Sequence, residues 1–194
     1  ESLLLMEVVA NESSEVRMVT KSVITALQPL EPILTPIPKR GLRSACEEFK
    51  HDFEGDYPIV MFPAGYCSRP LSSGHLFDFQ WYPTFLKMAR RTKRPIVPIH
   101  IDGENSQRFY RLSSLRRRLR IKTSLESLLL PDEMFHQRGK VVTLSVGQLI
   151  HPEQLSRETS DWHWADVIRN YVYTLGNQSQ LSFNPQAIPV LPLS

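Results

Sequence analysis

The chain has 194 residues, of which 41% are hydrophobic, 22% charged and 9% aromatic, with a net charge of +3. This composition is typical of one globular domain with a sizeable core and argues against a disordered chain. No uninterrupted apolar run approaches the roughly 18 residues that a membrane span needs. The two cysteines, Cys46 and Cys67, are too few for a disulfide framework and have no metal-ligand spacing, which favours a reducing compartment without a metal site.

Helical and strand patterns alternate along the chain. Helices are expected at 3–10, 23–27, 42–53, 79–91, 106–119, 124–136 and 161–175. Strands are expected at 16–19, 33–37, 58–62, 95–101 and 140–146. Within 79–91, Trp81, Phe85 and Ala89 are predicted to point inward, and Asp161 is predicted to cap the last helix. This alternation predicts an α/β fold in which helices flank a mostly parallel central sheet. The domain is expected to cover 1–177, with 178–194 as an extended, proline-rich C-terminal tail.

Positive charge is concentrated in one part of the sequence. Twelve Lys or Arg residues lie between Lys87 and Lys122, and only Asp102 and Glu104 oppose them. Such a block attracts anions, whether nucleic acid, acidic lipid or an acidic carrier protein. The alternative is a solvated helix face whose counter-ions lie elsewhere in the fold.

Two loops follow predicted strands at the sheet edge where ligands of open α/β sheets bind. The first loop, residues 62–70, contains Gly65, which tolerates a positive φ, together with the donors Ser68 and Arg69. The second loop spans 100–106 and gathers several polar side chains. Either loop could be a binding site or an ordinary surface turn.

Several ordered motifs resemble one known family. Phe62-Pro63-Ala64-Gly65 followed by Ser68-Arg69 resembles the F-P-x-G block of the glycerolipid acyltransferases, the PlsC-like lysophospholipid acyltransferases. Residues 96–99 match that family's V-P-hydrophobic block. Residues 78–85, 103–110 and 130–135 are similar to a narrower branch, the hemolysin-like proteins and the O-acyltransferases of ornithine and glycine lipid synthesis. The resemblance runs from residue 1 to about residue 150 and implies a PlsC-like acyltransferase fold.

In that family a His and an acidic residue in an H-x-x-x-x-D motif form the catalytic pair. The His removes the proton of an acceptor hydroxyl, which then attacks an acyl thioester. The motif precedes a helix like residues 2–10, so the resemblance places Glu1 on the acidic position. The His is then expected five residues before Glu1, which makes the sequence truncated at its N-terminus. Of the six histidines in the chain, His75 and His100 are the alternative candidates for the base, and structural roles are favoured for both.

The resemblance also implies acceptor-binding residues. Gly65, Ser68 and Arg69 are expected to bind an anionic acceptor, and Arg40 falls near the family's second acceptor-binding block. The alternative for Arg69 is a salt bridge with a neighbour such as Asp78. Ala64 stands where the wider family has Glu, which favours an aminolipid acceptor bearing a carboxylate. Further candidates are Phe62, Pro63, His75 and Asp78.

The predicted function is O-acyl transfer from an acyl thioester to a hydroxyl of a lyso-lipid, either an aminolipid or a lysophospholipid. No permanently bound cofactor is expected, and the donor is acyl carrier protein or coenzyme A carrying the acyl group. The expected location is the cytoplasm, peripheral on the inner face of the cytoplasmic membrane and in contact with its anionic surface. The alternative is a catalytically silent module that binds lipid or carrier protein. A nucleic-acid partner is not expected, because no recognised binding motif is present.

Nearby aromatic side chains have two open interpretations, as the lining of an acyl groove or as core. They are Trp81, Tyr82, Phe85, Phe109 and Tyr110.

Overall fold

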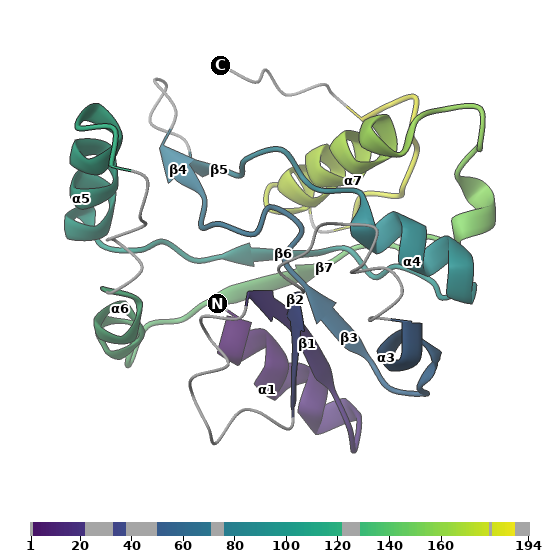
Figure 1. Ribbon diagram of the computed structural model, residues 1–194, viewed down its shortest axis with the longest axis horizontal. Coiled ribbons are helices and arrows are strands. Elements are labelled where there is room, and N and C mark those ends of the chain that lie inside the picture. Colours follow the sequence, from purple (N-terminus) through teal and green to yellow (C-terminus); the bar gives the residue numbers. More distant parts are fainter. Residues whose placement is uncertain are drawn as a thin grey trace.

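The computed structural model describes residues 2–21, 33–37, 50–70, 76–121, 129–178 and 180–188. Figure 1 shows the elements in space. The helices are α1 (Ser2–Glu12), α3 (Lys50–Glu54), α4 (Thr84–Thr92), α5 (Gln107–Arg118), α6 (Leu130–His136), the 3₁₀ helix η4 (Pro152–Gln154) and α7 (Asp161–Leu175). The strands are β1 (Arg17–Lys21), β2 (Leu34–Ile37), β3 (Ile59–Met61), β4 (Arg69–Pro70), β5 (Leu76–Phe77), β6 (Ile99–Asp102) and β7 (Thr143–Val146).

The N-terminal half contains a parallel three-stranded sheet in the order β2-β1-β3. The central strand places Met18 opposite both Leu34 and Val60, and all three side chains are buried. Leu5 and Met6 of α1 pack against this layer, which explains why a helix so apolar begins the described chain. The expected α/β class with a parallel sheet is therefore confirmed.

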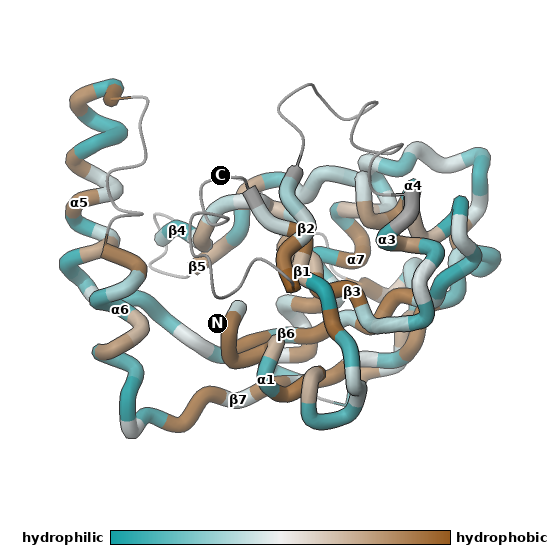
Figure 2. Tube along the Cα trace, turned by 60° about the horizontal axis from the view of Figure 1, so that its bottom comes forward, coloured by the Kyte–Doolittle hydropathy of each residue, from teal (hydrophilic) through white to brown (hydrophobic). Residues whose placement is uncertain are grey.

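Two further strand pairs are antiparallel, a feature that the sequence did not predict. Strand β6 pairs with β7 from Ile99–Val146 to Asp102–Thr143, and a bridge between Ile96 and Ile150 extends this pair. Strand β4 pairs with β5 in the same sense. The partly buried side chains of Ile99, Ile101 and Leu144 pack against the same apolar cluster as Leu5, Met6 and Met18. These contacts join the β6–β7 pair to the parallel sheet. Figure 2 shows hydrophobic segments at β2, β3, β6 and the start of α1.

The main core lies between α4, α7 and the loops that precede them. Trp81, Phe85 and Ala89 are buried, as the sequence predicted. The helix that carries the last two begins at Thr84 rather than at 79, because Pro83 has no N–H to donate and disfavours a helical conformation of the residue before it. The preceding residues, 78–83, form an irregular segment.

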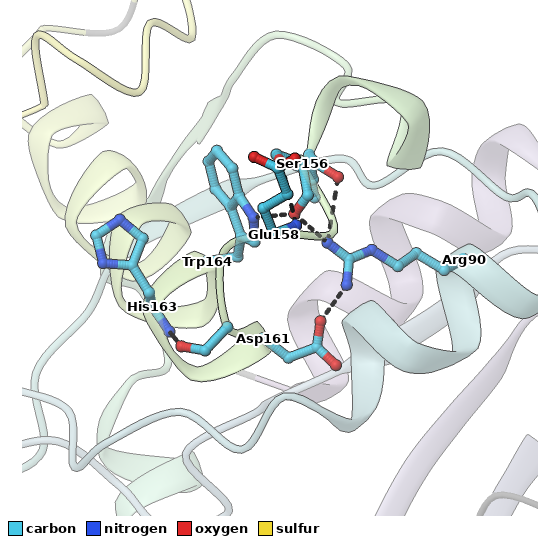
Figure 3. Close-up of polar contacts among 8 residues, drawn as sticks. Arg90, Ser156, Glu158, Asp161, His163 and Trp164 are labelled. Carbon is cyan, nitrogen blue, oxygen red and sulfur yellow. Dashed lines mark hydrogen bonds and ion pairs between the residues drawn. The ribbon is translucent and has the colours of Figure 1, made fainter.

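Helix α7 has the predicted bounds, Asp161–Leu175, but a different cap. The Ser160 hydroxyl accepts the His163 backbone N–H at 3.2 Å, so Ser160 and not Asp161 is the N-cap. The Asp161 carboxylate instead pairs with Arg90 of α4 (Figure 3). The same guanidinium donates to the Leu155 carbonyl at 3.2 Å and joins α4 to the start of α7.

The described part of the predicted tail, 180–188, packs onto the domain. The Tyr171 hydroxyl donates to the Leu181 carbonyl at 2.6 Å, and the Phe183 N–H donates to Gln148 Oε1 at 2.9 Å. Ile188 also packs against the main core. The expected helix 23–27 and the first parts of those expected at 42–53 and 124–136 lie outside the described residues.

Candidate functional site

A cavity of about 1300 Å³ lies between the parallel sheet, the β6 strand and α7. This volume exceeds the roughly 300–1,000 Å³ of most small-molecule pockets and is large enough for a lipid chain. Its lining is mostly apolar. The residues that line it include Leu5, Val9, Ile59, Met61, Phe62, Trp81, Phe85, Ile99, Ile101, Ile168 and Val172.

The first loop, residues 62–70, closes one part of this cavity. Gly65 has a φ of 66°, a left-handed value that favours glycine, and its N–H donates to the Phe62 carbonyl at 3.0 Å. The Pro63 carbonyl accepts the Tyr82 N–H at 3.1 Å, which ties the loop to the segment before α4. Gly65 therefore shapes a tight turn, and its amide is already engaged within the loop.

Ala64 of this loop is buried at 3% exposure in the main core beside Trp81 and Phe85. The wider family has a longer, charged glutamate at this position. The alanine is therefore consistent with the surrounding packing.

The Asp78 carboxylate lines the cavity and accepts two hydrogen bonds. Ser68 Oγ donates to Asp78 Oδ1 at 2.7 Å, and Trp81 Nε1 donates to Asp78 Oδ2 at 2.8 Å. Asp78 thus fixes the first loop against the segment before α4. The Ser68 hydroxyl donates its proton to this carboxylate rather than toward the cavity. Asp78 and Ser68 therefore position the first loop.

Tyr173 of α7 completes this polar cluster and was not singled out by the sequence. Burial raises the pKa of its hydroxyl above the usual range, and the nearby Asp78 carboxylate raises it further. A hydrogen bond with Ser68 acts in the opposite direction. The Tyr173 ring stacks on Phe77 with a centroid distance of 4.3 Å. The hydroxyl therefore stays protonated and serves as a hydrogen-bonding group of the cavity wall.

Arg69 is buried at 6% exposure, an unusual place for a guanidinium. It donates to the Cys67 and Ser68 carbonyls at 2.9 and 3.1 Å, and lies over the Phe109 ring at 5.2 Å. Phe109 and Tyr110, two of the candidate groove aromatics, are buried core residues. These contacts hold Arg69 in place from the loop and from α5.

Arg69 also lines a smaller hollow of about 390 Å³, and Arg116 of α5 lines the same hollow. Ala64 and Tyr66 border both this hollow and the large cavity. The Arg116 guanidinium also donates to the Ile121 carbonyl at 2.9 Å. Two arginines that line one hollow give it a positive charge, which favours a carboxylate or a phosphate. A hollow lined by two arginines therefore adjoins the apolar cavity.

His100 lies on β6 and lines the large cavity. Burial lowers its pKa, although the Asp102 and Asp78 carboxylates act in the opposite direction. Its ring takes the space beside Gly176, where an added Cβ would lie 2.5 Å from His100 Cε1. The ring also meets Tyr173 edge-on at 6.1 Å. Burial therefore favours the neutral imidazole, and its contacts with Gly176 and Tyr173 give the ring a packing role.

The second loop divides into two parts. Asp102 and Glu104 line the large cavity. Ser106 instead caps α5, accepting the Phe109 N–H at 3.3 Å while its own N–H and hydroxyl donate to the buried Glu133 carboxylate. The end of the loop is therefore structural.

Other predicted site residues lie outside the described segments. They are Glu1, Arg40 and His75. Within the described segments, no group of three or more His, Cys, Asp or Glu side chains is arranged to hold a metal ion. In that same part of the chain, no helix combines the length and the apolarity needed to cross a bilayer.

The family model described as "Acyltransferase" matches residues 1–181. The chain belongs to the acyltransferase family. The recognition of a PlsC-like acyltransferase from the first loop and its companion motifs is thereby confirmed.

This acyltransferase-family chain is similar to two curated proteins named lyso-glycine lipid O-acyltransferase. That of Phocaeicola vulgatus is 34% identical over 165 residues, which are 84% of this chain and 59% of the relative. That of Bacteroides thetaiotaomicron is 33% identical over 163 residues, 83% of this chain and 60% of the relative. The chain therefore spans about 60% of the length of these relatives.

One solved structure is also similar, the 1-acyl-sn-glycerophosphate (LPA) acyltransferase PlsC of Thermotoga maritima. Its TM-score is 0.44 at 17% identity, covering 87% of this chain and 59% of that chain.

Proposed function

We propose that this chain is the acyl-acceptor-binding part of an O-acyltransferase that moves a fatty acyl group from a thioester to a hydroxyl of a lyso-lipid. The observation that carries the proposal is the junction of the apolar cavity with the hollow lined by Arg69 and Arg116. A lyso-lipid has the same two parts, an apolar chain and a polar headgroup. Family membership and the two similar lipid acyltransferases support this reading.

The acceptor headgroup is proposed to carry a carboxylate, as in a lyso-glycine lipid. A planar guanidinium binds a carboxylate through two parallel hydrogen bonds, and such charged bonds contribute about 1.5–3 kcal/mol each. Arg69 and Arg116 are the proposed anchors. Arg40 remains a proposed contributor that the described residues do not include.

The general base is proposed to be a histidine five residues before Glu1, oriented by the Glu1 carboxylate. It takes the proton of the acceptor hydroxyl, and the hydroxyl oxygen forms a bond to the thioester carbonyl carbon. The carbon–sulfur bond then breaks, and the thiolate leaves with the transferred proton. The location fits, because Leu5 and Val9 of α1 line the same cavity as the first loop.

The donor is proposed to be acyl carrier protein or coenzyme A carrying the acyl group. The protein is proposed to work in the cytoplasm, on the inner face of the cytoplasmic membrane.

The proposal is tested with the complete protein, an acyl thioester and a lyso-glycine lipid, by measuring the diacylated product by mass spectrometry. The expected result is product formation that stops when the proposed upstream histidine is replaced by alanine. Arg138→Gln, an exposed arginine outside the site, is the matched surface control and should leave turnover unchanged. Binding of lipid without any product would contradict the proposal and favour the silent binding module.

A further inference from the structure

The structure separates the basic block of the sequence into two groups. Arg90 pairs with Asp161, and Arg94 donates to the Gly55 carbonyl at 2.8 Å and to the Tyr57 carbonyl, so these two hold the fold together. The arginines of α5 and of the turn after it are mostly exposed. They are Arg108, Arg111, Arg117, Arg118 and Arg120.

No acidic residue occurs between Gln107 and Ile121, so α5 presents one sign of charge. Figure 1 shows α5 at the edge of the molecule, beyond the end of β6. A helix of this charge creates a positive field that attracts an anionic partner.

Large apolar side chains lie exposed among these arginines. Leu115 is 52% exposed, Leu119 60% and Ile121 37%. Figure 2 shows hydrophobic and hydrophilic residues intermingled along α5. A partner that binds through charge alone does not require these side chains, whereas a lipid interface accepts both arginines and leucines.

Exposed aromatic side chains continue this surface. Tyr66, Phe79 and Tyr82 are about half exposed, and together with Arg116 they line the smaller hollow. Tyr66 and Phe79 meet edge-on at 5.8 Å. Tyrosine and other aromatic rings are enriched at membrane–water interfaces, because one end of the ring system is apolar and the other is wet.

We propose that residues 115–121 together with Tyr66, Phe79 and Tyr82 form a docking face for an anionic lipid bilayer. The guanidinium groups contact lipid phosphates, and the leucines and aromatic rings enter the interfacial layer. The choice of a lipid bilayer as the partner rests on the proposed function. Tyr66 also borders the large cavity, so a lipid acceptor can pass from the bilayer into that cavity. Charge complementarity and the intermingled apolar side chains favour a bilayer over nucleic acid.

Arg120 provides an independent probe of this face. Its φ is 54°, in the left-handed region where glycine is favoured after a helix. Arg120→Gly is therefore expected to raise the melting temperature while weakening vesicle binding about fivefold, since one arginine near an anionic surface contributes about 1 kcal/mol. Weaker binding cannot then be attributed to lost folding.

The test measures binding of the chain to phosphatidylglycerol vesicles and to phosphatidylcholine vesicles by sedimentation. Binding is expected to the anionic vesicles only and to weaken as salt rises. The double variant Arg117→Gln with Arg118→Gln is expected to lose roughly 30-fold in affinity. The control, Arg138→Gln with Arg157→Gln, removes the same charge from exposed positions elsewhere and should lose far less. Equal losses in the two double variants would overturn the proposal.

A second pair of variants tests the apolar contribution. Leu115→Ser with Leu119→Ser should weaken vesicle binding at least tenfold, whereas Val141→Ser, at a residue 94% exposed, should not. A DNA oligonucleotide and polyglutamate are the competing polymers. Tighter binding to either polymer than to anionic vesicles, or no effect of the leucine changes, would overturn the bilayer as partner. Because vesicle binding needs no turnover, its failure is distinguishable from a failure of acyl transfer.

Discussion

Helices α5 and α7 are both amphipathic by sequence, yet the fold uses them differently. Helix α7 buries eight side chains, among them Ile168, Tyr171 and Leu175, whereas α5 buries Phe109, Tyr110 and Ser113. The contrast extends to charge. The guanidinium of Arg169 in α7 is almost wholly buried over the Phe77 ring, while most arginines of α5 are exposed.

The difference teaches that the role of a helix follows from what covers it. Helix α7 lies against α4, β6 and the described part of the tail, so its side chains stabilise the fold. Helix α5 contacts the first loop through Arg69 and Phe109, and contacts α6 through Ser106 and Glu133. Most of the other side chains of α5 are exposed.

The largest expected effect tests this contrast directly. Leu175→Ala removes a fully buried side chain of α7 and should lower the free energy of unfolding by about 2–5 kcal/mol. Leu115→Ala, on the exposed part of α5, should change it by no more than about 0.5 kcal/mol. Urea denaturation measures both. Comparable losses would contradict the division of roles between the two helices.

A smaller effect concerns the end of α7. In Gly176→Ala the new methyl group would meet the His100 ring, and overpacking of this kind costs about 1–3 kcal/mol. His100→Ala should relieve the clash, so the double variant should lose less than the two single variants combined. Strict additivity of the two losses would mean that the ring does not occupy this space.

The two helix caps sharpen the comparison further. Ser160→Ala removes only the cap of α7 and should cost about 1 kcal/mol. Ser106→Ala removes the cap of α5 and also a partner of the buried Glu133 carboxylate, so its cost should be greater, about 1–3 kcal/mol. Thermal denaturation would rank the two variants, and the reverse order would disprove the Glu133 contact.

The smallest effect is a pH dependence from His100. Because burial holds its folded pKa below the unfolded value, its contribution to stability is present above about pH 6.5 and is lost as pH falls through the folded pKa. The slope of the unfolding free energy against pH should stay well below about 1.4 kcal/mol per pH unit, since the ring is only partly buried and the Asp102 and Asp78 carboxylates oppose the lowering of the pKa. His100→Gln should flatten the profile between pH 7.5 and 5.5. An unchanged profile would contradict this assignment.

The apolar periodicity of the sequence predicted those elements whose apolar face packs into the core. The bounds of α7 and the inward positions of Trp81, Phe85 and Ala89 followed from periodicity, since each of these side chains meets the main core. The start of α4 did not, because the apolar spacing continues through 79–83 although the helix begins after Pro83.

The pairing of strands that are distant in the sequence could not be predicted from the sequence. Nothing in residues 140–146 indicates that β7 runs antiparallel to β6, because a strand pattern carries no direction. The candidate site shows the same limit. The first loop was found through its motif, but Tyr173 lies ninety-five residues after Asp78 and only the fold brings them together. Arg116 had no signal beyond the basic block.

The central claim is that the hollow beside the cavity binds the acceptor's carboxylate, and one measurement tests it most directly. The complete protein is assayed with a lyso-glycine lipid and with its carboxamide analogue, for the wild type, Arg116→Gln and the control Arg138→Gln. In the wild type and the control, the KM for the carboxylate acceptor should be at least about tenfold lower than the KM for the carboxamide. In Arg116→Gln most of this difference in KM should disappear. Equal KM values for the two acceptors in the wild type would contradict the account.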